Sequence, residues 1–139
     1  MAVVSKANAE WKGSLKEGDG EVAFGTFKGV YTFASRFETG ADTNPEQLIA
    51  AAHAACYSMQ LSGILTGDGT PPTRIRTAAS VTIQAGEGIT GIALETVGVV
   101  PGIDDATFQA AAEKAKEICP VSGALAAVKT ITLKATLEA

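Results

Sequence analysis

The stretch that decides the fold is residues 44–59, NPEQLIAAAHAACYSM, in which a marked helix start precedes a long apolar run. Asn44 is a favoured N-cap residue, Pro45 suits the first helical position, and Gln47 occupies the capping-box position. The apolar residues behind them recur at the spacing of one helix face: Leu48, Ile49, Ala52, Ala55, Cys56, Met59 and Gly63. Most of the opposite face is alanine or leucine too, so we predict a helix that is buried on several sides and ends at residues 67–72.

Upstream of this helix, residues 9–33 carry alternating apolar positions interrupted by glycines, which predicts two or three antiparallel strands. Residues 34–43, which hold Arg36, are expected to form a loop. Downstream, the alternation over residues 75–85 and the segment 89–100 predict a hairpin. A helix capped by Asp104 should end at Cys119, because Pro120 restricts the residue before it, and residues 131–138 should form a last strand. The order β-β-β-α-β-β-α-β indicates a single α+β domain over residues 1–139.

The composition excludes several classes of partner. The chain has a net charge of −4, a pI near 4.9 and three arginines, so neither nucleic acid nor an anionic membrane is expected to bind. The longest uncharged apolar run, residues 48–59, is shorter than the roughly 20 residues of a membrane span, and no signal-type segment precedes it. A cytoplasmic location is expected. The hydrophobic share of 46% against 19% charged residues favours an oligomer.

Cys56 and Cys119 are the only cysteines. From the sequence alone these two thiols are redox-active, bind a metal or are inert core residues. One histidine and two distant cysteines lack a paired metal-ligand spacing, so no metal and no cofactor is predicted. Cys56 lies about three turns into its helix, beyond the reach of the helix dipole, and burial raises a thiol pKa unless a cation is close. Arg36 is the best-placed cation, and His53, three residues before Cys56, is the rival activator.

Each of these residues also has an ordinary structural explanation. A cysteine in an alanine-rich helix is often a small core residue, and His53 is often a hydrogen-bonded core or interface residue. Arg36 alone resembles a surface arginine, and the helix dipole accounts for Glu46 in the first turn. The Gly-x-Ser-x-Gly signature of serine hydrolases is absent.

Three motifs decide between these interpretations. Residues 44–59 resemble the signature helix of the OsmC/Ohr family of organic hydroperoxide reductases. Residues 35–38, SRFE, and residues 115–122, AKEICPVS, resemble the arginine loop and second-cysteine motif of the same family. The helix sequence AAHAAC is more similar to that of the osmotically inducible OsmC branch than to that of the organic hydroperoxide resistance branch.

The resemblance implies an OsmC-like fold, in which antiparallel sheets wrap around central helices in an intertwined homodimer with two interfacial active sites. It implies that Cys56 is the peroxidatic thiol and Cys119 the resolving thiol. It also implies that Arg36 holds the Cys56 thiolate and that Glu46 orients Arg36. The expected activity is an antioxidant thiol peroxidase that reduces organic hydroperoxides, with hydrogen peroxide as a further substrate, and is recycled by a dithiol reductant. The residues themselves are also compatible with two other functions: a non-catalytic dimer that binds a small ligand, and a redox sensor.

Overall fold

The structure is a computed structural model that describes residues 1–139, the whole chain. It divides into two compact units, Met1–Leu48 and Ile49–Ala139, and each is described by itself. The single domain expected from the sequence stays a prediction.

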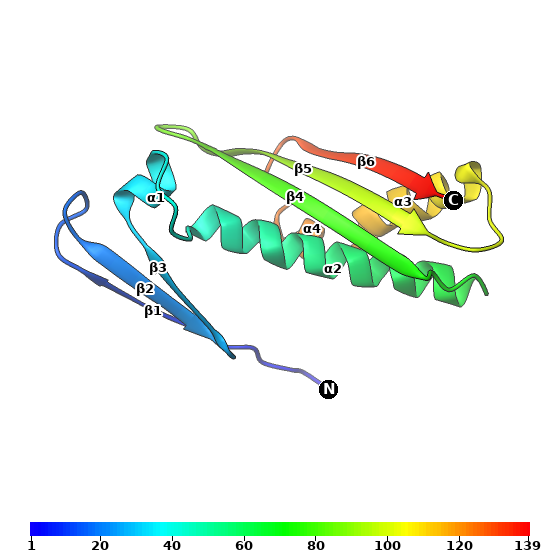
Figure 1. Cartoon of the computed structure of the whole chain (residues 1–139), viewed down its shortest axis with the longest axis horizontal. Helices are drawn as coiled ribbons and strands as arrows, with labels where there is room; N and C mark the ends of the chain where they lie inside the picture. Colours follow the sequence, from blue (N-terminus) through cyan, green and yellow to red (C-terminus); the bar gives the residue numbers. More distant parts are fainter. The chain divides into compact units, whose positions relative to one another are not determined.

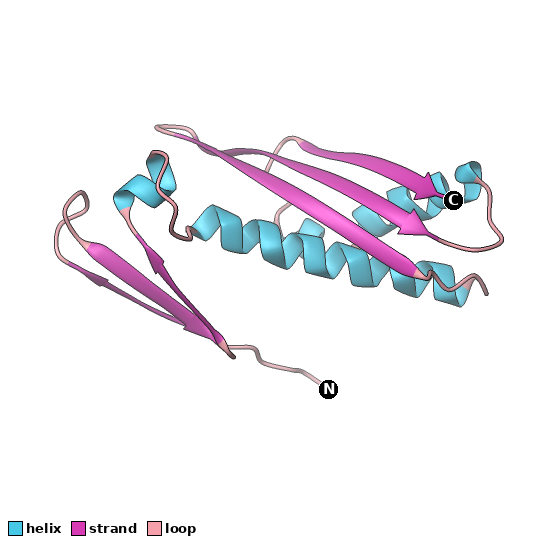
Figure 2. Ribbon diagram, viewed as in Figure 1, coloured by secondary structure: helices cyan, strands magenta, loops and turns pink.

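The first unit is a three-stranded antiparallel meander followed by a short helix (Figure 2). Its elements are β1 (Asn8–Lys12), β2 (Asp19–Phe24), β3 (Phe27–Tyr31) and α1 (Phe33–Phe37). Trp11 and Tyr31 pack with ring centroids 5.4 Å apart over Gly20, where a Cβ would lie only 2.5 Å from the Tyr31 ring. Even so, Phe24 and Val30 stay more than 40% exposed, so this sheet has no buried core of its own in one chain.

Helix α1 corrects the expectation of a loop over residues 34–43. The Thr32 side chain accepts a hydrogen bond from the Ser35 backbone N–H at 3.0 Å, and the Ser35 hydroxyl accepts one from the Thr32 N–H at 2.8 Å. This reciprocal capping box stabilises the first turn of a helix. Arg36 therefore lies on a helix and not in a loop.

Helix α2 (Pro45–Gly67) begins as predicted, because Asn44 Oδ1 accepts the Gln47 backbone N–H at 2.7 Å. The predicted burial of α2 on several sides is not seen in a single chain. The side chains that are almost fully buried are His53, Tyr57, Leu61 and Leu65, spaced four residues apart. Met59, on the predicted face, is 78% exposed in a single chain. An apolar helix surface thus remains uncovered.

The second unit contains a three-stranded sheet in the order β4-β5-β6, with helices on one side of it (Figure 1). Strands β4 (Arg74–Gln84) and β5 (Gly88–Val99) form the predicted antiparallel hairpin. Helices α3 (Asp105–Ile118) and α4 (Pro120–Ala124) connect β5 to β6 (Ile131–Glu138). This helical crossover lets β6 pair parallel to β5. The Asp104 side chain caps α3 at 2.8 Å from the Thr107 N–H, as predicted.

The hydrophobic core of the second unit lies between this sheet and the helices. Its fully buried members include Tyr57 and Leu61 of α2, Leu94 of β5, and Phe108 and Ala115 of α3. Cys119 belongs to the same cluster and is 1% exposed. The α+β class predicted from the sequence is confirmed.

By length and composition, α2 is the one helix that meets the criteria for a membrane span, with a mean hydropathy of 1.3 over the qualifying window. The core helix of a soluble protein meets the same criteria. In this chain α2 carries the buried imidazole of His53 and buries Tyr57 against α3, which is the behaviour of a core helix.

The close packing of Phe108 on β5 yields a first prediction. A Cβ at Gly98 would lie 2.5 Å from the Phe108 ring, whereas a Cβ at Gly91 on the same strand would meet its nearest atom at 3.8 Å. We expect Gly98→Ala to lower the free energy of unfolding by about 1–3 kcal/mol, because the buried ring has to shift. The matched Gly91→Ala variant should change it by less than about 1 kcal/mol. Urea denaturation measures both, and equal stability of the two variants would contradict the packing.

Candidate active site

The two cysteines lie in contact in the second unit, although they are 63 residues apart in sequence. Their sulfur atoms are 3.2 Å apart, close enough for one thiol to donate a hydrogen bond to the other. Both are free thiols; Cys119 is buried and Cys56 is partly exposed. A small shift would bring the sulfurs to the roughly 2.05 Å of a disulfide.

Packing of α2 against α3 produces this contact. Tyr57, the residue after Cys56, is fully buried and donates its phenolic hydrogen to the Ala112 carbonyl of α3 at 2.9 Å. Burial raises the pKa of Tyr57 above its usual range, so the phenol remains a donor. Cys119 ends α3, where its N–H donates to the Ala115 carbonyl at 2.9 Å, and Pro120 begins α4. One thiol therefore projects from mid-helix and the other from a helix junction.

The surroundings of the two thiols shift their pKa values in opposite directions. Burial is the largest effect and raises the pKa of Cys56; a hydrogen bond with the Val121 backbone lowers it by less, and the neighbouring Cys119 raises it again. Burial alone would raise the pKa of Cys119, but hydrogen bonds from Ser122, Cys56 and Val121 outweigh it and lower the value. No positively charged group of the second unit contributes to the pKa of Cys56, and burial outweighs the hydrogen bond with the Val121 backbone.

Arg36 and Glu46 form an ion pair in the first unit. The Arg36 Nη2 atom lies 2.8 Å from Glu46 Oε1, and Nε donates to the same carboxylate at 3.1 Å. The Glu46 side chain is only 6% exposed, whereas that of Arg36 is 40% exposed. A buried carboxylate thus fixes a planar guanidinium that still presents one side to an incoming group.

The turn between α1 and α2 brings this pair together. Ser35 is 4% exposed; its hydroxyl donates to the Thr43 carbonyl at 2.8 Å and its carbonyl accepts from the Asn44 amide at 2.8 Å. Gly40 approaches so closely that a Cβ there would lie 2.7 Å from the Ser35 backbone. These contacts fold residues 38–44 back, so Arg36 faces the first turn of α2.

His53, the alternative to Arg36 as activator of Cys56, forms its hydrogen bond with another residue. Its Nε2 atom lies 2.6 Å from the Ser122 hydroxyl oxygen, deep in the core, and burial lowers its pKa. This contact between His53 and Ser122 was not predicted from the sequence.

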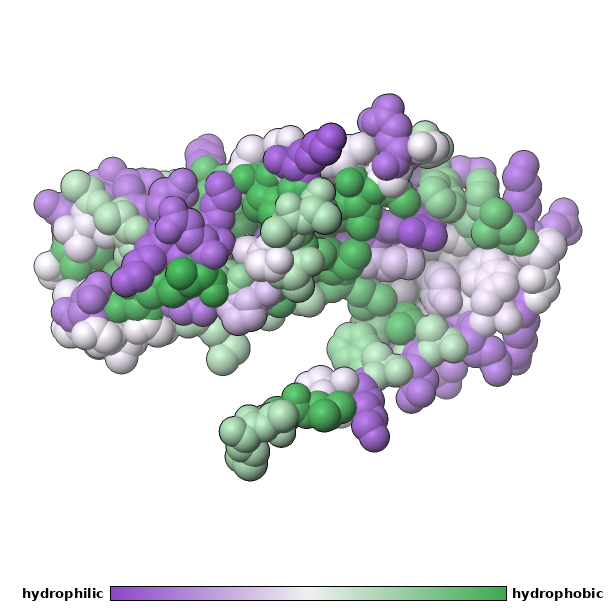
Figure 3. Space-filling view, turned by 180° about the vertical axis from the view of Figure 1, so that it is seen from behind, coloured by the Kyte–Doolittle hydropathy of each residue, from purple (hydrophilic) through white to green (hydrophobic).

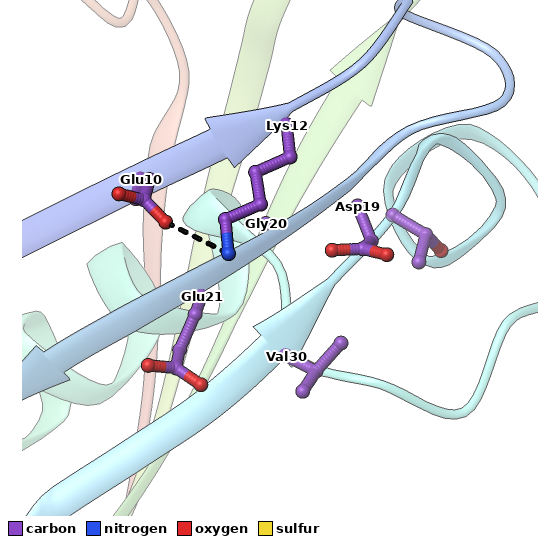
Figure 4. A pocket seen from close by; sticks show the side chains of 7 residues that line it. Glu10, Lys12, Asp19, Gly20, Glu21 and Val30 are labelled. Carbon is purple, nitrogen blue, oxygen red and sulfur yellow. Dashed lines mark ion pairs between the residues drawn. The ribbon is translucent and has the colours of Figure 1, made fainter.

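Two cavities lie in the first unit. An apolar one of about 250 Å³ is lined by Arg36 together with Trp11, Leu15, Phe33 and Phe37. The other, of about 390 Å³, is lined by charged residues of the exposed sheet, with Lys12 paired to Glu10 at 3.3 Å (Figure 4). It contains neither a thiol nor Arg36 and does not belong to the site.

No group of three or more histidine, cysteine or acidic side chains is placed so that it could hold a metal ion.

Comparison with known proteins gives consistent results. Residues 38–134 match the family described as OsmC-like protein. The chain is 47% identical to the peroxiredoxin OsmC of Escherichia coli (strain K12), over 94% of the chain and 96% of that protein. It is 37% identical to an organic hydroperoxide resistance protein of Xanthomonas axonopodis pv. citri, over 68% and 67%. The crystal structure of an OsmC-like protein from Mycoplasma pneumoniae shares the fold, with a TM-score of 0.77, 15% identity and full coverage of both chains.

The contact between the sulfurs yields a second prediction. One equivalent of a mild oxidant such as diamide should join Cys56 to Cys119 within one chain, because the sulfurs are already 3.2 Å apart. Intact mass and peptide mapping would show the loss of two hydrogens and one cross-linked peptide pair. Cys119→Ser is the control and should form no such link. Chains joined to one another on a non-reducing gel, with no internal link, would contradict this arrangement.

Proposed function

Because the chain belongs to the OsmC-like family, we propose that it is a cysteine-based peroxidase that reduces organic hydroperoxides through Cys56 and Cys119. The observation that carries the proposal is the 3.2 Å separation of the two sulfurs. Inert core thiols need no such contact, and a site that only binds a ligand would not need a second thiol beside the first. Hydrogen peroxide is a further substrate of the same chemistry.

In the first step the Cys56 thiolate attacks the terminal oxygen of the hydroperoxide. A sulfur–oxygen bond forms, the oxygen–oxygen bond breaks, and the other oxygen leaves as an alkoxide that takes up a proton to become an alcohol. Cys56 is now a sulfenic acid. Cys56 takes this role because it is partly exposed, whereas Cys119 is 1% exposed and shielded from a substrate.

In the second step Cys119 attacks the Cys56 sulfur, and hydroxide leaves and is protonated to water. The product is a disulfide, which a dithiol then reduces to restore both thiols and complete the cycle. A reducing compartment, the cytoplasm, supplies such dithiols and keeps the resting enzyme in its free-thiol form.

Arg36 and Glu46 supply what Cys56 lacks in its own unit. Burial raises the pKa of Cys56, so a cation is needed to stabilise its thiolate. The guanidinium of Arg36, held through two nitrogens by Glu46, has the geometry to bind the thiolate and the peroxide oxygens together. We assign Arg36 as the activating cation and Glu46 as the residue that orients it.

The aromatic cavity beside Arg36 supports an organic substrate. Rings of Trp11, Phe33 and Phe37 line a space of about 250 Å³ that opens next to the guanidinium. An apolar tail would remove these rings from water while its peroxide group meets the charge. Hydrogen peroxide lacks a tail and gains nothing from this cavity.

The geometry of α2 supports a homodimer in which the two halves of each site come from different chains. Glu46 and Cys56 are ten residues apart, so α2 separates them by about 15 Å along its axis. We assign Arg36 of the partner subunit to each Cys56.

The uncovered apolar surface of one chain supports the same dimer. Met59 is 78% exposed in the middle of α2, and Phe24, Phe27 and Val30 are exposed on the first sheet. Figure 3 shows apolar residues in green on the surface of the chain and not confined to its interior. A second copy would cover an exposed face of α2 and an exposed sheet in one association.

The peroxidase function is tested by replacing the proposed nucleophile. Cys56→Ser should lose peroxide consumption in the presence of a dithiol, because a serine hydroxyl is not ionised at neutral pH. The wild type should consume cumene hydroperoxide with a lower KM than hydrogen peroxide, because of the aromatic cavity. Cys119→Ser should accumulate a sulfenic acid on Cys56 that a dimedone-type probe detects after one peroxide equivalent. Full turnover by Cys56→Ser would refute the proposal.

The shared site is tested by mixing two inactive chains. Arg36→Ala alone should raise the pKa of Cys56 and lower kcat/KM at neutral pH on the order of tenfold or more, the loss that one pKa unit produces. A dimer of one Arg36→Ala chain and one Cys56→Ser chain should recover about half of the wild-type activity, because one site then holds both intact residues.

The control for this experiment is a chain that carries both substitutions, paired with the wild type. If both residues act within one chain, that pair keeps one intact site and the mixed dimer keeps none. If they act across chains, the doubly substituted pair has no intact site. The two arrangements therefore give opposite results.

A further inference from the structure

A buried polar pair in the second unit has no role in the cycle described so far. The His53 ring is completely buried and Ser122 is 7% exposed, yet His53 Nε2 and Ser122 Oγ lie only 2.6 Å apart. The other ring nitrogen, Nδ1, is buried without a hydrogen-bond partner. Burying such groups costs free energy, and two apolar side chains would fill the same space without this cost. The pair therefore calls for a function other than filling the core.

The hydrogen bond between His53 and Ser122 joins the same two segments as the contact between the cysteines. His53 precedes Cys56 by three residues on α2, so the two side chains share one side of that helix. Ser122 follows Cys119 by three residues, at the third position of α4. Two side-chain contacts thus join α2 to the start of α4, at 2.6 Å between His53 and Ser122 and at 3.2 Å between the sulfurs.

Helix α4 has little of its own to fix its direction. It has only five residues, too few to form a stable helix alone, and its N-cap residue Cys119 makes no side-chain cap hydrogen bond. Cys119 has φ −58° and ψ 122°, so the backbone leaves the helical conformation between α3 and α4 and can turn there. Val121 and Leu125 pack against the hydrophobic core, but apolar contacts have no preferred direction. A buried hydrogen bond does have one.

We propose that His53 and Ser122 are positioning residues, whose hydrogen bond anchors α4 to α2 and so holds the Cys119 sulfur beside Cys56. This inference rests on the peroxidase cycle proposed above and assigns two further residues to its resolving step.

The unpaired ring nitrogen fixes the direction of this hydrogen bond. Burial lowers the pKa of His53, so the ring is neutral and carries one N–H. That hydrogen belongs to Nε2, from which it donates to Ser122 Oγ, because the other tautomer leaves a buried N–H with no acceptor. His53→Gln, whose amide also donates, can therefore keep this bond, whereas His53→Leu removes it.

Position matters because the resolving step is an attack within one chain. The Cys119 thiolate forms the sulfur–sulfur bond while the sulfur–oxygen bond of the Cys56 sulfenic acid breaks, and the hydroxide that leaves takes up a proton to become water. Such a reaction is fast when the reacting atoms are held about 3–3.5 Å apart, and a shift of about 1 Å slows it greatly. The 3.2 Å between the sulfurs lies in this range. If α4 turns away at Cys119, the sulfurs separate and the step slows.

The direct test measures how readily the two thiols form their disulfide without any peroxide. The protein is equilibrated with mixtures of reduced and oxidised glutathione, in which oxidised glutathione takes up two electrons and two protons from the thiols and becomes two molecules of reduced glutathione. Ser122→Ala and His53→Leu should each lower the equilibrium constant for the disulfide about tenfold, the effect of losing one buried hydrogen bond. This raises the reduction potential of the cysteine pair by about 30 mV. His53→Gln should recover most of the loss.

The consequence for the cycle is measured after one equivalent of hydrogen peroxide. In Ser122→Ala the rate of disulfide formation should fall about tenfold, while the Cys56 sulfenic acid forms no more slowly than in the wild type. Quenched-flow alkylation followed by mass spectrometry separates the two species. The decrease should persist at alkaline pH, where both thiols are ionised, because it comes from their position. A decrease that disappears there would assign the effect to thiol ionisation and overturn the proposal.

A double variant separates position from stability. Ser122→Ala alone leaves the buried His53 N–H without an acceptor and should lower the temperature of unfolding. Adding His53→Leu leaves no polar group of the pair unpaired and should restore much of that stability. Disulfide formation should stay slow in the folded double variant, because an apolar contact does not fix the direction of α4. Recovery of the wild-type rate together with stability would show that the pair only fills the core, against the proposal.

The matched control is Ser58→Ala. Ser58 is a partly buried serine of α2, two residues after Cys56, and its hydroxyl donates to Thr77 of β4 at 2.8 Å. This variant also removes one hydroxyl hydrogen bond of α2, but not one that reaches α4. It should leave both the reduction potential and the disulfide rate unchanged. Thermal unfolding of every variant shows whether it is folded under the assay conditions.

The outcomes separate this proposal from the peroxidase function. If Ser122→Ala and His53→Leu are folded and keep the wild-type potential and disulfide rate, the proposal is overturned even when peroxide turnover is normal. If the wild type forms no sulfenic acid, the peroxidase function is refuted, while the equilibrium with glutathione still decides whether His53 and Ser122 hold the two thiols together.

Discussion

The contact between Cys56 and Cys119 depends on one interaction: the packing of α2 against α3 through Tyr57. Its ring is fully buried and its hydroxyl donates to the Ala112 carbonyl at 2.9 Å, so the helices cannot slide without leaving a buried polar group unpaired. Ala112 is two turns before Cys119 on α3, as Tyr57 is one residue after Cys56 on α2. Fixing this contact fixes the thiols, and the redox chemistry follows from helix packing and not from a flexible loop.

Burial brings the two thiols together, but it also disfavours their ionised forms. The groups around each sulfur change this effect differently, so the pKa values of the two thiols shift in opposite directions. Cys119 receives hydrogen bonds from Ser122 at the start of α4, which lower its pKa despite burial. Cys56 lies in the middle of a helix, and burial raises its pKa despite a hydrogen bond with the Val121 backbone. In the proposed function, a cation from outside the second unit stabilises the Cys56 thiolate. The Arg36–Glu46 pair, with the carboxylate 6% exposed and the guanidinium 40% exposed, supports that proposal.

Much of this was predictable from the sequence, and the failures have physical causes. Asn44, Pro45 and Gln47 mark a helix start through local chemistry, and the alternation over residues 75–85 marks a strand, so the α+β class was found. Which face of α2 is buried within a single chain was not predicted, because a helix that is apolar nearly all round carries no periodic signal to choose a face. Helix α1 was missed, since its capping box joins Thr32 to a serine where the usual partner is glutamate. The Arg36–Glu46 pair was implied by the family motifs, whereas the contact of His53 with Ser122 joins residues 69 positions apart and no local pattern reveals it.

The difference in acidity also bears on which thiol meets the peroxide. If acidity alone decided, Cys119 would be the nucleophile, since its pKa is lowered and that of Cys56 is raised. Access decides otherwise, because Cys119 is 1% exposed in a packed core and a hydroperoxide could reach it only by opening that core. Cys56 is partly exposed, and burial raises its pKa. In the proposed homodimer, a cation from the partner subunit would stabilise its thiolate, so that reactivity toward peroxide would belong to the dimer.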